Sequence, residues 1–266
     1  MSGGSRRRLI VLTCRRRGSA SRCLAALVEH PLLEVASVVL AHGGSPKPSR
    51  TFSRKLAKVL RIGPLGALNG IRMRRWYADD TAPELAEECR RLKVPLVEVP
   101  WINAERTREV FRAIDADLGI SLGNGYIAPS VFSIPRHGMI NLHTEILPEF
   151  QGAQAVIWAI HEGRRETGFT IHQVAKAIDA GDILLAERYP IEFEPTLRGT
   201  VERMLRVARS RIPAAVARTC AEYEVRRAAA VPQSPGRSFT TPSLWAFLRM
   251  RRENARGWRE QHAAER

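Results

Sequence analysis

Three consecutive segments near the N-terminus constrain the fold most. Residues 8–14, RLIVLTC, form a continuous apolar run that is typical of a strand buried on both faces. A Gly-Ser turn with apolar residues at helical spacing covers 18–30, and a second strand pattern covers 33–43. Strand, helix and strand at this spacing form a βαβ unit, which implies a parallel sheet and a right-handed crossover. We therefore predict an α/β, Rossmann-like fold whose mostly parallel, twisted sheet carries helices on both faces.

The same alternation returns after residue 80. Patterns typical of strands cover 95–100, 117–123, 138–143, 167–175 and 182–191, and the last two can form a hairpin across the KAIDAG turn. Patterns typical of helices cover 81–92, 104–114, 154–162 and 196–210, the last continuing with a break at Pro213 to about residue 224.

Two regions depart from this rhythm. Residues 44–80 contain a Pro/Ser turn, a basic amphipathic segment over 52–62 and a Gly-rich break, which we interpret as an insertion on the rim of the sheet. The tail from Arg226 is rich in Ala, Pro and Arg, with one amphipathic piece over 244–250. We divide the chain into a main domain, 1–210, and a basic, helical or irregular C-terminal extension, 211–266.

The charge balance favours an anionic partner. The formal net charge is +15, from 42 Lys and Arg against 27 Asp and Glu. Such an excess suits nucleic acid, an anionic membrane surface or anionic small molecules. Because the arginines are spread through the whole chain, a genome that favours Arg codons explains the excess equally well.

No segment indicates export or membrane insertion. The apolar run 9–13 is too short for a signal peptide and is followed at once by Arg15, and no run approaches the length of a membrane span. The four cysteines show no CxxC pair or zinc spacing. We expect a cytoplasmic protein with reduced thiols.

Polar side chains follow the strands predicted over 138–143 and 167–175. In NLHTEILPEFQG, Asn141 and His143 share one face of a strand end, where open α/β folds bind their ligands. Thr170, His172 and the turn that begins at Asp179 form a second group. An amide, an imidazole and a carboxylate can hold a carbonyl, stabilise its oxyanion and move one proton. The histidines lack metal-site spacing, and we expect no metal.

The order NLHTEILPEFQG…TGFTIHQVAKAIDAGDIL resembles the formyltransferase family that uses 10-formyltetrahydrofolate, which includes glycinamide ribonucleotide, methionyl-tRNA and sugar N-formyltransferases. The shared pattern is Asn-x-His, then Leu-Pro and Gly, then Asp-x-Gly. Here these positions are Asn141, His143, Leu147-Pro148, Gly152 and Asp179-Ala-Gly181. The resemblance implies that 1–210 is the catalytic domain of an N-formyltransferase, a one-carbon group transferase.

The resemblance also implies roles. Asn141 and His143 would stabilise the formyl oxygen while an amine attacks the formyl carbon. Asp179 would favour the cationic form of His143 and take the proton that the amine loses. His172, with Thr170 beside it, would orient Asp179 from a second layer, or would be a packed strand histidine.

The donor, 10-formyltetrahydrofolate, would be a co-substrate bound between two loops. The loop residues are Asn124, Gly125, Tyr126, Ile127, Val174, Ala175, Lys176, Ala177 and Ile178. For the acceptor, Gly18 and Ser19 would form an anion site at a helix N-terminus, next to the run of arginines, or a plain strand-to-helix turn. Glu145 stands where the family commonly has Ser; it would hold a substrate ammonium or face solvent.

The acceptor is predicted to be a small amine, because the other members of the family carry features that this sequence lacks or lack a segment that it carries. A methionyl-tRNA enzyme would be expected to carry a C-terminal β-barrel, whereas the residues after 205 lack alternating strand patterns. A purine-pathway enzyme would lack 44–80, and a hydrolase would usually carry an N-terminal regulatory domain. A phosphate-bearing acceptor, such as a nucleotide-linked amino sugar, remains; a homodimer is compatible with it. The alternatives are a tRNA-directed enzyme, a formyltetrahydrofolate hydrolase and a non-catalytic binding protein.

Overall fold

The computed structural model describes residues 6–42, 62–152, 154, 156–234 and 236–263. Seven strands form one sheet in the order β3-β2-β1-β4-β5-β7-β8. The parallel strands are β1 (Arg7–Thr13), β2 (Leu33–Ala41), β3 (Leu96–Val99), β4 (Leu118–Ser121) and β5 (Met139–His143). The antiparallel hairpin is made by β7 (Glu166–Gln173) and β8 (Ile183–Pro190). The predicted fold class and the hairpin are confirmed.

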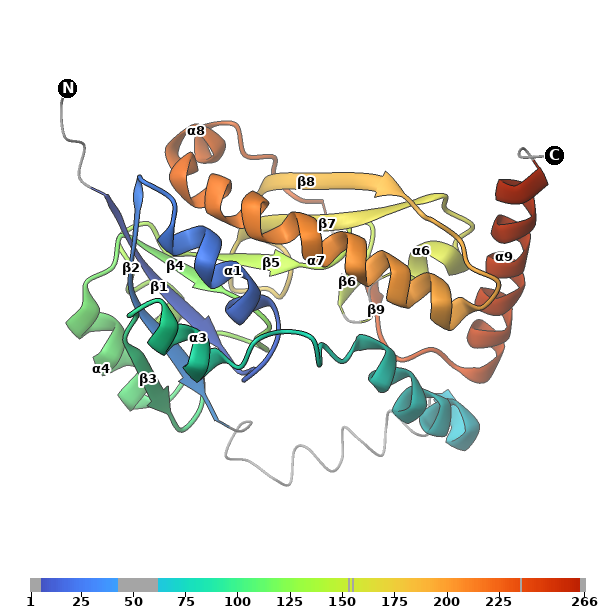
Figure 1. Ribbon diagram of the computed structural model, residues 1–266, viewed down its shortest axis with the longest axis horizontal. Helices are drawn as coiled ribbons and strands as arrows, with labels where there is room; N and C mark the ends of the chain where they lie inside the picture. Colours follow the sequence, from blue (N-terminus) through green and yellow to red (C-terminus); the bar gives the residue numbers. More distant parts are fainter. Residues whose placement is uncertain (1–5, 43–61, 153, 155, 235, 264–266) are drawn as a thin grey trace.

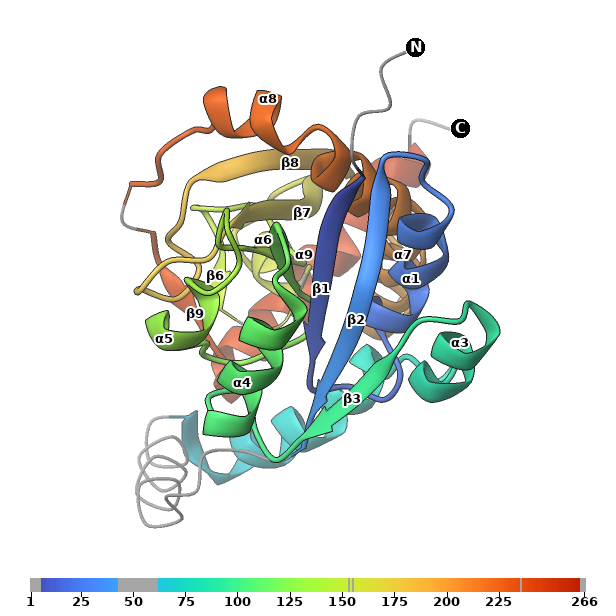
Figure 2. The ribbon, with the colours of Figure 1, turned by 90° about the vertical axis from the view of Figure 1, so that its left-hand side faces the viewer.

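Helices cover both faces of the sheet (Figures 1 and 2). The first layer contains α1 (Ser19–Val28), α3 (Leu85–Arg91) and α7 (Leu197–Ala221), and the second contains α4 (Glu105–Ile114) and α5 (Pro129–Phe132). In β1, Leu9 and Val11 belong to the first core, whereas Ile10 and Leu12 belong to the second. Residues 9–12 are therefore all apolar because each of these side chains meets one of two cores.

The last third of the chain returns to the sheet's edge. A short strand, β6 (Gln151–Gly152), pairs with β9 (Ser238–Phe239). The remaining helices are η1 (Arg75–Tyr77), α6 (Ile157–His161), α8 (Tyr223–Ala228) and α9 (Leu244–Ala263). The amphipathic piece predicted over 244–250 is thus the start of a longer helix.

The predicted break at Pro213 is wrong, because α7 continues through it. Proline removes one backbone hydrogen bond from a helix interior. Ile212, Ala215 and Val216 are buried on the same helix, so apolar packing offsets that loss. The predicted boundary at residue 210 lies inside α7, so the division into 1–210 and 211–266 stays a prediction.

The predicted Gly-rich break is also wrong, because residues 62–74 are helical. Two of the three glycines in this helix, Gly66 and Gly70, allow close packing against the tail. A Cβ at Gly70 would lie 2.4 Å from Cγ2 of Thr241, and a Cβ at Gly66 would lie 3.4 Å from the carbonyl oxygen of Pro242. The basic segment over 52–62 lies outside the described residues except for Ile62.

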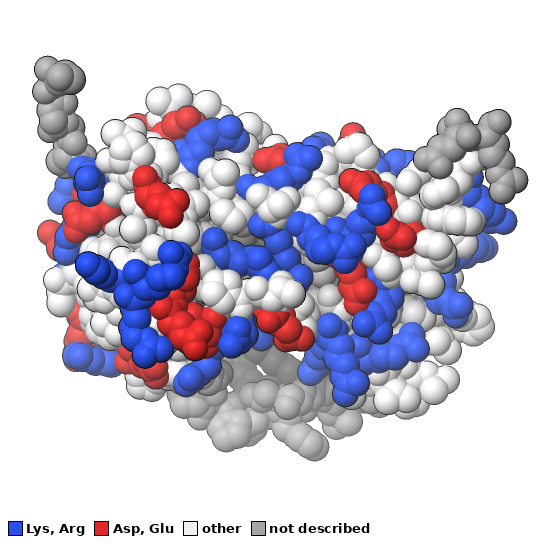
Figure 3. Space-filling model, viewed as in Figure 1, with Lys and Arg blue, Asp and Glu red and all other residues white. Residues whose placement is uncertain are grey.

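The surface carries interleaved charges of both signs. On the face shown in Figure 3, Lys and Arg (blue) cover more area than Asp and Glu (red). Many arginines are paired; Arg203, for example, contacts both Glu192 and Glu194. Among the described helices, none is long and apolar enough to cross a membrane.

Candidate active site

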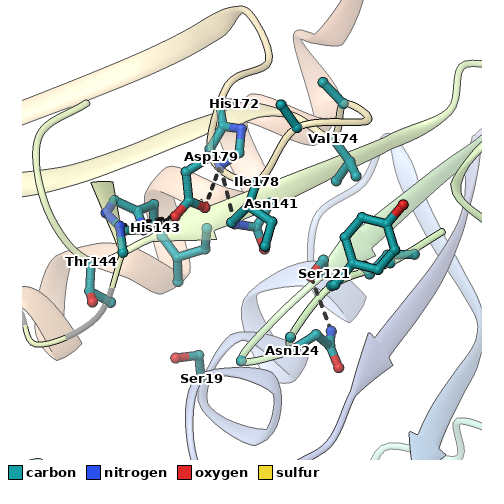
Figure 4. Close-up of a pocket in the computed structure, with 18 residues that line it drawn as sticks. Ser19, Ser121, Asn124, Asn141, His143, Thr144, His172, Val174, Ile178 and Asp179 are labelled. Atoms are coloured by element: carbon teal, nitrogen blue, oxygen red, sulfur yellow. Dashed lines mark hydrogen bonds and ion pairs between the residues drawn. The ribbon is translucent and has the colours of Figure 1, made fainter. Parts of the chain in front are cut away.

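A cavity of about 390 Å³ lies at the carboxyl ends of β4 and β5 and below the loop that follows β7 (Figure 4). Most of the predicted site residues line it: Ser19, Asn124, Gly125, Tyr126, Ile127, Asn141, His143, His172, Val174, Ala175, Ala177, Ile178 and Asp179. Four do not: Gly18, Glu145, Thr170 and Lys176. The structure therefore brings the Asn-x-His segment and the Asp-x-Gly turn to one place.

Asn141 is oriented by the neighbouring antiparallel strand. Asn141 on β5 pairs with His172 on β7, and its Nδ2 donates to Nε2 of His172 over 3.1 Å. The Nδ1 of His172 lies 2.8 Å from the carbonyl oxygen of Gln173, which can only accept, so Nδ1 carries the hydrogen. Burial lowers the pKa of His172, which favours this neutral form. One hydrogen of the Asn141 amide is thus committed to His172, and the second is left for a ligand.

His143 has an acceptor at each ring nitrogen. Its Nε2 donates to the carbonyl oxygen of Phe150 over 2.8 Å, and its Nδ1 lies 3.7 Å from Oδ2 of Asp179. The residue is only 8% exposed. The ring is therefore held between the carbonyl oxygen of Phe150 and the carboxylate of Asp179.

Asp179 reaches the two histidines from a left-handed turn. Its φ is 52°, a conformation that aspartate adopts more readily than most residues. Oδ2 accepts a hydrogen bond from the backbone nitrogen of Gly152 at 3.2 Å, and Oδ1 lies 3.8 Å from Nε2 of His172. A Cβ at Gly181 would lie 1.9 Å from the carbonyl oxygen of Gln173. The glycine of the Asp-x-Gly motif is therefore needed to close the turn that presents Asp179.

The loops 124–127 and 174–178 add apolar side chains and a polar atom to the cavity. Tyr126 is 47% exposed and Ile178 is 64% exposed, although both are large and apolar. Asn124 donates to the carbonyl oxygen of Leu12 and to Oγ of Ser121, while its buried Oδ1 has no partner among the described residues. These groups can pack against a flat ring and accept a hydrogen bond from its edge.

Sequence reasoning missed Asn103, which holds the 124–127 loop in place. Its Nδ2 donates to the carbonyl oxygen of Tyr126 over 3.0 Å, and its Oδ1 accepts from the backbone nitrogen of Ala128 over 2.7 Å. Ser121, Gly123, Leu142, Thr144 and Gly152 also line the cavity and were not predicted as binding residues. The sequence could have indicated them, because most lie directly beside predicted residues at the ends of strands.

Glu145 does not line the cavity, and its burial contradicts the predicted contact with a substrate ammonium. The residue is only 4% exposed, and its carboxylate accepts hydrogen bonds from the backbone nitrogens of Val156 and Ile146. Thr170 likewise serves the loop: its Oγ1 donates to the carbonyl oxygen of Glu145 and accepts from the nitrogen of Leu147. Both residues therefore hold the segment after β5 through hydrogen bonds to its backbone, and neither lines the cavity.

The described residues contain no group of three or more His, Cys, Asp and Glu placed to hold a metal ion. The polar groups that the cavity offers are the amide, imidazole and carboxylate described above. Hydrogen bonding and proton transfer are the chemistry that these groups can perform.

Curated relatives match part of the chain. Methionyl-tRNA formyltransferase of Listeria monocytogenes serotype 4a (strain HCC23) is 28% identical over 156 residues, which are 58% of this chain and 49% of the relative. The enzyme of the same name from Halalkalibacterium halodurans is 34% identical over 42% of this chain and 35% of the relative. The chain thus spans about half, or less, of the length of these relatives.

Solved structures share the fold. Glycinamide ribonucleotide transformylase 1 from Symbiobacterium toebii has a TM-score of 0.57 at 17% identity, over 89% of this chain and 98% of that one. An N-formyltransferase from Helicobacter canadensis, solved with folinic acid and dTDP-3-aminofucose, has a TM-score of 0.53 at 13% identity, over 88% and 71%.

The family comparison agrees with the geometry of the cavity. A family profile described as formyl transferase matches residues 103–216, a range that contains Asn141, His143 and Asp179. These three residues surround one cavity at the end of a fold that formyltransferases share. Residues 103–216 of the chain match the formyl transferase family, and the chain shares the fold of solved formyltransferases.

Proposed function

We propose that the protein is an N-formyltransferase that moves the formyl group of 10-formyltetrahydrofolate to a primary amine. The observation that carries this proposal is the meeting of the Asn141 amide, the His143 imidazole and the Asp179 carboxylate around one cavity. The three come from two strand-end segments that are distant in sequence. An amide and an imidazole beside a proton acceptor suit acyl transfer to nitrogen.

In the proposed reaction, the amine nitrogen attacks the formyl carbon and negative charge develops on the formyl oxygen. The free hydrogen of the Asn141 amide stabilises that oxygen, since the other is held by His172. His143 holds the Asp179 carboxylate beside the cavity, because its Nδ1 faces Oδ2 of Asp179 while its Nε2 donates to the carbonyl oxygen of Phe150.

Proton transfer completes the reaction. The carbon–nitrogen bond to the acceptor forms, the bond from carbon to N10 of the folate breaks, and the amine loses one proton. Asp179 takes this proton and returns it, directly or through a water molecule, to N10. The hydrogen bond from Gly152 to Oδ2 holds the carboxylate for this task. No atom or charge is left over.

The donor is proposed to bind between the loops 124–127 and 174–178. The cavity volume of about 390 Å³ lies within the range of small-molecule sites, roughly 300–1,000 Å³. Tyr126 and Ile178 offer exposed apolar surface to the ring system, and Oδ1 of Asn124 offers an acceptor. A folate needs both kinds of contact.

The acceptor is proposed to be a small amine that bears phosphate, such as a nucleotide-linked amino sugar. Ser19, at the start of α1, lines the cavity, and Arg15 packs beside Gly123 on its rim. Arg15 and Arg16 are exposed, and neither has a carboxylate within ion-pair distance among the described residues. Unpaired guanidinium groups favour phosphate binding.

Aminoacyl-tRNA is the second candidate acceptor, because the matched curated relatives are named methionyl-tRNA formyltransferases. The two acceptors differ in their response to salt. Binding of tRNA should weaken steeply as ionic strength rises, because several phosphates are neutralised at once. Binding of a small nucleotide should change much less.

The test is incubation of the purified chain with 10-formyltetrahydrofolate and a panel of amines, with release of tetrahydrofolate as the measurement. The panel holds nucleotide-linked amino sugars, phosphorylated amines, unphosphorylated amines and methionyl-tRNA. Acceptor-dependent release with a phosphorylated amine supports the proposal. Release without any acceptor indicates a hydrolase, and donor binding without release indicates a binding protein; either result overturns it.

A further inference from the structure

Glu145 joins both ends of one loop to the sheet. One carboxylate oxygen, Oε1, accepts a hydrogen bond from the nitrogen of Val156. The other, Oε2, accepts from the nitrogen of Ile146 and from Oγ1 of Thr167 on β7, each at 3.3 Å. We call the chain between Ile146 and Val156 the clasp loop. A single buried side chain thus fixes where this loop begins and where it ends.

The clasp loop carries contacts to two of the proposed catalytic side chains. The carbonyl oxygen of Phe150 accepts from Nε2 of His143, and the nitrogen of Gly152 donates to Oδ2 of Asp179. A further bond runs from Nε2 of Gln151 to the carbonyl oxygen of Asp179. The positions of the imidazole and the carboxylate therefore both depend on this loop.

We propose that Glu145 is a positioning residue that sets the relative placement of His143 and Asp179 through the clasp loop. This inference rests on the proposed function. Glu145 does not touch the cavity; it acts through the carbonyl oxygen of Phe150 and the nitrogen of Gly152. Its role differs from the substrate contact that the sequence suggested.

The arrangement requires a group with two acceptor oxygens. Two backbone nitrogens and one hydroxyl donate to the carboxylate of Glu145. When the carboxylate is ionised, its two oxygens can accept all three hydrogen bonds. A glutamine keeps one acceptor but turns an NH₂ group toward the remaining donors. An alanine leaves the nitrogen of Val156 without an acceptor in a buried site, which costs more than the hydrogen bond itself provides.

The charge of Glu145 changes near neutral pH. Burial raises the pKa of Glu145 to about 7, and the hydrogen bonds from Val156, Ile146 and Thr167 oppose this rise. The other titratable groups that face it are Glu149, Tyr77 on η1 and Tyr189 on β8. Both tyrosines have a raised pKa, chiefly because they are buried, and stay neutral. Glu145 is therefore the group in this cluster that ionises as pH rises through neutrality.

The activity test uses Glu145→Ala, Glu145→Gln and the control Glu149→Gln. Glu149 lies in the same loop, but it is partly exposed and pairs with Arg188 and Arg164. We expect Glu145→Ala to lower kcat by at least ~10-fold while KM for donor and acceptor changes less than ~3-fold. The control should stay within ~2-fold of the unaltered chain.

The pH profile separates positioning from a merely structural role. Neutral Glu145 resembles glutamine, so the ratio of kcat between the unaltered chain and Glu145→Gln should be near one at pH 6. It should rise several-fold by pH 8.5 as the carboxylate ionises. A ratio that does not change with pH contradicts the proposal.

Hydrogen exchange of the amides over 146–152 tests the clasp without any turnover. Glu145→Ala should exchange faster there than the unaltered chain and the Glu149→Gln control, with β1 unchanged. If no acceptor is formylated, the proposed function fails while this measurement still decides the clasp. Unchanged exchange and unchanged kcat in a folded Glu145→Ala variant would overturn the inference. If that variant does not fold, the pH comparison with Glu145→Gln decides.

Discussion

The parallel half of the sheet and the antiparallel hairpin divide the work of the site differently. From β3 to β5 the strands are covered by helices on both faces, and β1 is buried along most of its length. In the hairpin, β8 alternates between buried and exposed residues. Asn141 and His143 come from the covered half, whereas His172 and Asp179 come from the hairpin. In the proposed mechanism, the half that is covered on both faces supplies the groups that stabilise charge, and the hairpin supplies the group that moves a proton.

The largest expected effect comes from removing any one of the three proposed catalytic groups, two from the covered half and one from the hairpin. We expect Asn141→Ala, His143→Ala and Asp179→Asn each to lower kcat by about 10²–10⁴-fold, the size usual for a lost oxyanion donor or proton acceptor. Steady-state kinetics with circular dichroism as a fold check measures this. The matched control is Asp182→Asn, which lies in the same turn but does not line the cavity. An Asp179→Asn variant with normal kcat would remove the hairpin from the chemistry.

The second largest effect is expected from Gly181→Ala, which should disturb the hairpin and leave the parallel half unchanged. Gly181→Ala places a methyl group where only 1.9 Å separates it from the carbonyl oxygen of Gln173, so the turn must shift and carry Asp179 with it. We expect kcat to fall by at least ~10-fold while the far side of the sheet keeps its hydrogen-exchange protection. Loss of protection in β1 and β2 as well would show that the halves unfold as one unit.

The free energy of unfolding should depend on pH through Glu145, which follows β5 in the parallel half and accepts a hydrogen bond from Thr167 in the hairpin. Because burial raises the pKa of Glu145 to about 7, the folded chain binds this proton more tightly than the unfolded chain, whose glutamate titrates near 4.5. The resulting stability is fully present below about pH 4.5 and is lost as pH rises to about 7, by ~3 kcal/mol. Glu145→Gln should remove this slope, as urea unfolding at several pH values can measure. An equal slope in the variant would assign it to other groups.

The smallest expected effect concerns the 124–127 loop of the parallel half. Asn103→Ala removes the bonds to Tyr126 and Ala128 that hold the 124–127 loop. We expect KM for the folate donor to rise about 3- to 10-fold while kcat stays within about 2-fold, since the reacting groups are untouched. A fall in kcat without a change in KM would place this loop against the acceptor instead.

Local pattern was sufficient where one interaction dominates. The apolar runs predicted the strands because most residues of β1 and β2 are buried in one of two cores. The Asn-x-His and Asp-x-Gly motifs predicted residues around the cavity. Pattern failed where distant packing decides. Gly66, Gly70 and Pro213 normally interrupt helices, but here they are accommodated by the tail and by buried apolar side chains.

The role of Glu145 could not be read from sequence for the same reason. A carboxylate two residues after His143 looks like a substrate group until its partners are known. Those partners are backbone nitrogens of Ile146 and Val156 and the hydroxyl of Thr167, which only the folded chain brings together. Sequence indicates the chemistry that a residue can perform; the surroundings determine whether it is performed on a ligand or on the protein itself.

The pairing of β6 with β9 links the site to the order in which the chain is made. Gly152 lies so close to Phe239 that a Cβ on it would be 2.3 Å from that residue's carbonyl oxygen, and Gly152 also holds Asp179. A nascent chain that has been synthesised as far as the end of α7 already contains Asn141, His143 and Asp179. It still lacks β9, the strand that pairs with Gly152. We therefore expect the pocket to mature late in translation, so that prematurely terminated products ending before Ser238 remain inert even when their sheet has formed.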